Sequence, residues 1–183
     1  MGALSASMTA PQVQALLEDG ALTGEWVLHP GRSSIRLTTR SMGVIPVKGV
    51  FREVSGYGKV AADGRVSGTV TVAAASIDTQ NKRRDAHLRS ADLLNCDAYP
   101  DITFSADSVR PSGGGLAVTG ALAIGGRTRP LTIDAAVTAQ DDGEISLDAV
   151  VHVNRADFGI TYNPLGLIGV HNTLGIHAVF ARW

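Results

Sequence analysis

From Glu25 onward, apolar and polar residues alternate with a period of two. Segments of this kind recur along the chain at 34–39, 66–72, 116–124, 131–137, 145–153 and 173–182. A strand with this alternation buries one face and exposes the other. The pattern therefore predicts an all-β fold from Glu25 to the end of the chain.

Glycine-containing turn signals separate the predicted strands. Asp63-Gly64, 113–115 and 141–143 can adopt the positive φ angles that hairpin turns require. We expect eight or nine strands joined mainly by hairpins, which form an antiparallel meander. Because closure removes the exposed edges of a meander, a barrel of about eight strands is favoured over a sandwich.

The first 22 residues form an extension that we separate from the barrel domain, residues 23–183. Thr9 and Gln12 have the spacing of a capping box, and Gly20 supplies a stop signal. Val13 and Leu17, with Leu16 between them, form an apolar stripe at helical spacing. We expect an amphipathic helix over 9–20 that packs on the barrel; a lid or partner-binding role is the alternative.

One internal segment, residues 76–99, lacks the strand pattern and is rich in charge. Asp78 or Thr79 can cap a helical turn that runs to Arg89, and Asp85 is placed to pair with Arg89 one turn later. A helical insertion of this length within a meander is a candidate flap over one barrel mouth.

Composition narrows the functional classes. The chain has 16 basic and 17 acidic residues, which argues against nucleic-acid binding and against a polybasic membrane anchor.

No apolar run approaches the ~18 residues of a membrane-spanning helix. The N-terminus lacks the basic and apolar regions of a secretory signal, so we expect a cytoplasmic protein. The single cysteine and the spacing of the five histidines do not indicate a metal site.

Catalytic and phosphate-binding motifs are missing from the sequence, but two polar groups stand out. The first, 84–90 with Asp92, is interpreted as a solvated helical face with local ion pairs. The second is 155–159, where Arg155 either clamps a loop by pairing with Asp78, Asp85 or Asp157, or contacts a ligand head group.

These polar groups belong to a larger set of motifs. The set comprises 76–79, 84–85, 87–90, Asp92, 99–104, 120–124, Gly126, 128–130, Arg155 and 157–159. In this order the motifs resemble the YceI-like family of lipocalin-like barrels that bind polyisoprenoids, and the resemblance covers about residues 24–183. Many members carry two phenylalanines where this chain has Leu93-Leu94, and many are periplasmic.

The resemblance implies non-enzymatic binding, transport or storage of an isoprenoid quinone or polyprenyl phosphate, with no other cofactor. Only 5% of the residues are aromatic, so a barrel lined by smaller side chains leaves room for such a ligand. One alternative is a scaffold or interaction module whose barrel is filled by its own side chains. Another is an enzyme on an apolar substrate, with His87 or His171 as general base. The sequence leaves open whether the barrel forms a homodimer.

Candidate ligand-binding residues fall into three groups. Inward strand positions that would line the channel are Ile35, Leu37, Val70, Val72, Phe104, Leu122, Ile124, Val151 and Val153. Their inward orientation depends on the register, since a shift of one residue would turn them all outward. Candidate gate residues are His87, Leu88, Leu93, Leu94, Phe158, Leu165, Leu167 and Ile168. Arg84 and Arg155 are the candidates for contact with a ligand head group.

Overall fold

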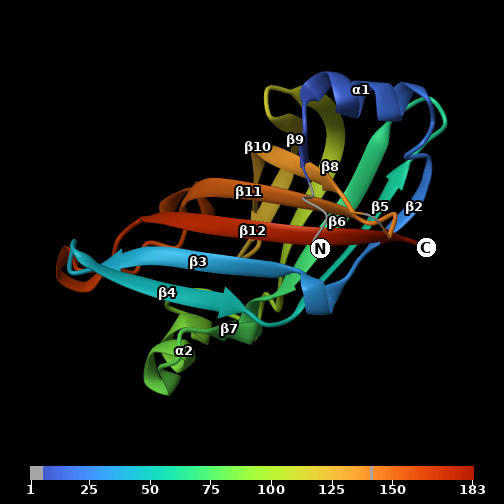
Figure 1. Ribbon diagram of the computed structural model, residues 1–183. Coiled ribbons are helices and arrows are strands. Elements are labelled where there is room, and N and C mark those ends of the chain that lie inside the picture. Colours follow the sequence, from blue (N-terminus) through green and yellow to red (C-terminus); the bar gives the residue numbers. More distant parts are fainter. Residues whose placement is uncertain (1–5, 141) are drawn as a thin grey trace, which may run out of the picture.

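The centre of the molecule is a closed antiparallel barrel of eight strands, seen in a computed structural model that describes residues 6–140 and 142–183 (Figure 1). Around the ring, the strands are β2 (Gly24–Leu28), β5 (Val54–Val60), β6 (Val66–Ala73), β8 (Asp101–Ser112), β9 (Gly115–Ile124), β10 (Arg127–Ala139), β11 (Ile145–Asn154) and β12 (His171–Arg182). The ring closes because β12 pairs with both β11 and β2. The predicted all-β barrel is confirmed.

Tight hairpins link most of these strands. The β9–β10 pair runs from Gly115 opposite Ala136 to Ile124 opposite Arg127. Its turn consists of Gly125 and Gly126, with φ angles of 57° and 76°. A Cβ at Gly126 would lie 2.6 Å from the ring of Tyr99, so this position needs glycine for space as well as for its backbone angle.

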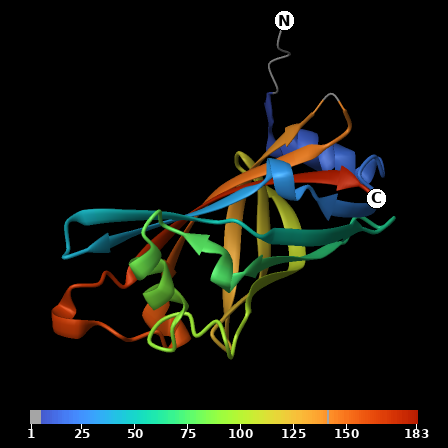
Figure 2. The ribbon, with the colours of Figure 1, turned by 90° about the horizontal axis from the view of Figure 1, so that it is seen from below.

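The sheet continues beyond the ring at one end. The first half of β12 pairs with β3 (Ser34–Ser41), which follows β2 after the short 3-10 helix η1 (Pro30–Arg32). β3 pairs with β4 (Ile45–Phe51), and β4 pairs with β7 (Ile77–Asp78). This three-stranded extension projects from the barrel in both views (Figures 1 and 2).

The N-terminal helix α1 (Ala10–Glu18) covers the opposite end of the barrel, where the β8–β9 hairpin turns (Figure 1). The capping box of Thr9 and Gln12 is present, as predicted. Val13 is buried, and α1 packs against β8 and β9. Before the helix, β1 (Ser7–Met8) pairs with the end of β10. The expected extra helix packed on the barrel is therefore confirmed.

The predicted helical insertion is α2 (Lys82–Arg89), preceded by η2 (Ala74–Ser76) and β7. Its N-cap is Asn81, whose side chain accepts a hydrogen bond from the Arg84 amide, so neither Asp78 nor Thr79 has this role. The expected pairing of Asp85 with Arg89 is also wrong. Asp85 is buried and accepts hydrogen bonds from the amide and hydroxyl of Thr79. A carboxylate shielded from water needs such partners within the protein.

Two further 3-10 helices, η3 (Arg155–Phe158) and η4 (Pro164–Gly166), lie in the loop between β11 and β12. This loop, residues 155–170, is beside the α2 segment, residues 79–99, at the barrel end remote from α1 (Figure 2). In the described part of the chain, neither α-helix is long and apolar enough to cross a bilayer.

Candidate functional site

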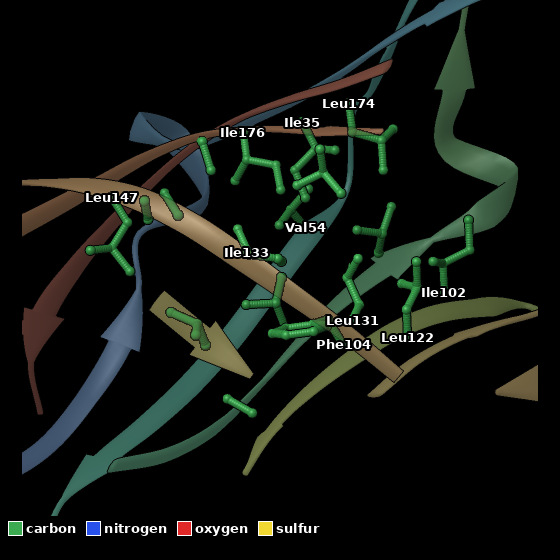
Figure 3. A pocket seen from close by; sticks show the side chains of 18 of the residues that line it. Ile35, Val54, Ile102, Phe104, Leu122, Leu131, Ile133, Leu147, Leu174 and Ile176 are labelled. Carbon is green, nitrogen blue, oxygen red and sulfur yellow. The ribbon is translucent and has the colours of Figure 1, made fainter. Parts of the chain in front are cut away.

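The barrel encloses an elongated cavity of about 380 Å³ whose wall is almost entirely apolar. Side chains point into it from strands on all sides, because every second residue of a barrel strand faces inward (Figure 3). Phe104, Leu122 and Ile133 lie on one side, and Ile35 and Ile176 on another (Figure 3). The volume is within the ~300–1,000 Å³ typical of small-molecule sites.

The cavity extends from one end of the barrel to the other. At one end its wall includes Val13 and Leu17 of α1. At the other end the wall includes Leu88 of α2 and Ile168 of the 155–170 loop. A barrel filled by its own side chains, the scaffold alternative, does not fit this cavity.

All nine strand residues predicted to face the channel lie on the cavity wall: Ile35, Leu37, Val70, Val72, Phe104, Leu122, Ile124, Val151 and Val153. Further wall residues follow from the same alternation but were not predicted: Leu131, Ile133, Leu147, Leu174 and Ile176. Leu131 and Ile133 flank Thr132, and Leu174 and Ile176 flank Gly175, so the signal for them was present in the sequence.

The candidate gate residues divide into three sets. Leu88, Leu93, Leu94 and Ile168 lie on the wall at the α2 end. Phe158 is buried behind the wall, in contact with the cluster of Leu122, Val151 and Val153. His87, Leu165 and Leu167 are outside the wall. Leu165 is 91% exposed, because it occupies a left-handed turn of η4 (φ 57°) that directs its side chain away from the barrel.

The guanidinium of Arg84 does not reach the cavity. It donates to the hydroxyl and the carbonyl oxygen of Thr79, each over 2.8 Å, and so braces the start of α2. Sequence reasoning could not place Arg84, because its partner is fixed by the fold of the 79–99 segment.

Arg155 does lie on the cavity wall and is only 7% exposed. Its guanidinium clamps the 155–170 loop by donating to the carbonyl oxygens of Ile160 (2.7 Å), Ile168 (3.3 Å) and Gly169 (3.0 Å). Among the described residues it has no carboxylate within ion-pair distance, so the expected pairing with Asp78, Asp85 or Asp157 is wrong. Burial lowers the pKa of Arg155 below its usual range.

At the α2 end of the barrel, one side-chain contact joins the 79–99 segment to the 155–170 loop. The rings of His87 and Tyr162 meet edge to face, with centroids 5.1 Å apart. His87 Nε2 also lies 3.3 Å from an Asp92 carboxylate oxygen, but both side chains are more than 40% exposed. His171 is exposed at the start of β12. Neither proposed general base therefore faces the cavity.

Residues 26–180 match the sequence profile of the YceI-like domain. Protein YceI of Escherichia coli O157:H7 is 45% identical over 73 residues, which are 40% of this chain and 38% of that protein. Protein YceI of Salmonella arizonae is 37% identical over 97 residues, 50% of this chain and 51% of the relative. The matched segments thus span about half or less of these curated relatives.

Solved structures share the barrel. BcnA of Burkholderia cenocepacia superposes with a TM-score of 0.75 at 23% identity, covering 83% of this chain and 98% of BcnA. A polyisoprenoid-binding domain from Saccharophagus degradans gives 0.72 at 13% identity, covering 86% and 98%. The YceI protein of Campylobacter jejuni gives 0.58 at 26%, covering 73% and 84%. The match of the profile and the shared barrel agree with the resemblance carried by the motifs, and the chain belongs to the YceI-like domain family.

Proposed function

We propose that this protein binds, and thereby transports or stores, an isoprenoid lipid in the barrel cavity without acting on it as an enzyme. The observation that carries the proposal is the elongated apolar cavity running from α1 to α2. Its wall supplies almost no polar partners, so the ligand portion inside must itself be apolar and slender. The polyisoprenoid-binding domain from Saccharophagus degradans, which shares the barrel, supports the same choice.

Burial of the tail alone is sufficient for tight binding. Each methylene removed from water contributes about 0.8 kcal/mol, so a few prenyl units offset the cost of ordering a flexible chain. The branched tail would contact the predicted wall residues, such as Val70, Phe104 and Val151. Catalytic groups are not needed for this function.

The α2 end is the proposed mouth, through which the tail enters. There the 79–99 segment and the 155–170 loop meet through the His87–Tyr162 ring contact. Leu93, Leu94 and Ile168 would surround the first units of the tail. Arg155 uses three of its five N–H groups on loop carbonyls, which leaves donors for a quinone oxygen or a phosphate head group.

The direct test is to purify the protein gently, extract it with organic solvent and analyse the extract by mass spectrometry. A prenyl lipid in near-stoichiometric amount is expected. Protein that is repeatedly empty, including after incubation with membrane lipids, would contradict the proposal.

Two variants of adjacent residues in β11 control this experiment. Ala149 lies on the cavity wall, whereas Val150 points outward and is 64% exposed. Ala149→Phe places a ring in the cavity and should remove most of the bound lipid, while Val150→Phe should retain it. Equal lipid content in the two folded variants would place the lipid outside the cavity.

A further inference from the structure

Helix α1 forms the end wall of the cavity. Val13 is 1% exposed, and together with Leu17 and the following Leu22 it lies on the cavity wall. The helix ends before residue 26, where the match to the family profile begins. The end wall is therefore built by a segment that precedes the residues matching the family profile.

Both ends of this segment are anchored. Before α1, Ser7 and Met8 pair with Thr138 and Val137 at the end of β10. After α1, the Arg182 guanidinium donates to the carbonyl oxygens of Ala21 and Thr23.

The indole of Trp26 adds to this second anchor by donating to the carbonyl oxygen of Leu22 over 2.9 Å. The Arg182 guanidinium also lies over the Trp26 ring, 4.8 Å from its centroid. Backbone pairing and these bonds fix α1 in place. At the α2 end, the 79–99 segment and the 155–170 loop are each held to the sheet, and they meet through the ring contact of two partly exposed side chains, His87 and Tyr162. A fixed end opposite a mouth makes the cavity a pocket of defined depth.

We propose that α1 is a floor that sets the maximum length of the lipid tail, with Val13 and Leu17 as the specificity-determining residues. This inference rests on the proposed lipid-binding function. A tail that fits contacts these two side chains with its last unit. A longer tail that leaves a membrane or micelle has carbons in water at the mouth, and each such carbon weakens binding about fourfold relative to that apolar phase.

The test uses delipidated protein and a mixture of isoprenoid quinones that differ only in the number of prenyl units. Bound quinones are extracted and quantified by mass spectrometry. Leu17→Ala removes three carbons from the floor and deepens the pocket, so the bound fraction should shift toward longer quinones, by up to one prenyl unit. Leu17→Phe makes the pocket shallower and should shift the bound quinones toward shorter tails. This second variant keeps the test decisive if the alanine variant folds poorly.

Leu16→Ala is the matched control, because Leu16 is on the same helix but off the cavity wall. It should retain the length distribution of the unmodified protein. An unchanged distribution in the folded Leu17 variants would overturn the floor while leaving lipid binding intact. Failure of the unmodified protein to bind any quinone would instead overturn the proposed function, and the floor with it.

Discussion

The Nε of Arg155 donates to the carbonyl oxygen of Gly169 over 3.0 Å and ties the two ends of the β11–β12 loop together. With the bonds to Ile160 and Ile168, this side chain supplies donors to three loop carbonyls. Because these carbonyls belong to the proposed mouth, the geometry of the mouth depends on one buried cation.

Replacing Arg155 with methionine should destabilise the protein. The variant keeps much of the apolar stem but leaves three carbonyl oxygens without their donor, so we expect the free energy of unfolding to fall by about 3 kcal/mol. Urea denaturation measures this change. Arg65→Met replaces a side chain that is 86% exposed and should change the free energy of unfolding by less than about 0.5 kcal/mol. Equal effects of the two substitutions would show that the clamp is unimportant.

Replacing Tyr162 with alanine should speed the release of bound lipid. The edge-to-face contact with His87 is worth about 0.5–1.5 kcal/mol, so its loss should raise the release rate by a factor of about 2 to 13. Transfer of a fluorescent prenyl lipid from the protein to vesicles gives this rate. Tyr162→Phe retains the ring and should release lipid at the unmodified rate. If all three proteins release lipid equally fast, the mouth lies elsewhere.

The carboxyl of Asp78 should contribute to the acid sensitivity of stability. The hydrogen bonds from the Arg52 guanidinium, and then that from the Gln80 amide, hold the pKa of Asp78 below its usual value. A lowered pKa in the folded state stabilises the protein above the ordinary value of about 3.9, and this contribution is lost as pH falls through the folded pKa.

Asp78→Asn should therefore show a smaller loss of stability than the unmodified protein as the pH falls below about 4. Unfolding by urea at a series of pH values provides the comparison. Arg52→Met removes the first cause of the shift and should flatten the curve in the same direction. Curves parallel to that of the unmodified protein would contradict this role of the Arg52–Asp78 pair.

The barrel and its lining could be predicted because both follow from a repeat of two residues. In β11, Val151 and Val153 face the cavity while Val150 is exposed, so alternation decides the side of each residue in an apolar stretch. The same rule would have identified Leu131 and Ile133. A shift of one residue in the strand pairing would have turned these side chains outward. In the observed strand pairs, the predicted inward residues lie on the face that lines the cavity.

The irregular segments could not be predicted in the same way. Leu165 and Ile168 are both apolar and close in sequence, yet one is 91% exposed and the other is on the wall. Backbone angles in η4 decide this difference, and no periodic pattern encodes them. The partners of Arg155 were missed because they are backbone carbonyls, which every residue carries.

The role of α1 at the cavity also depends on distant contacts. Its capping box and apolar stripe predicted the helix, but which end of the barrel it covers is decided by contacts with β8 and β9, about a hundred residues away along the chain. Local patterns thus predict the element, and only the assembled barrel places Val13 on the cavity wall.

The most direct measurement is the stoichiometry with which delipidated protein binds an isoprenoid quinone at equilibrium. The cavity predicts saturable binding of one quinone per chain, since a single elongated space runs from α1 to α2. Binding that never saturates, or no binding at all by folded protein, would contradict the proposal that the barrel interior is a lipid site.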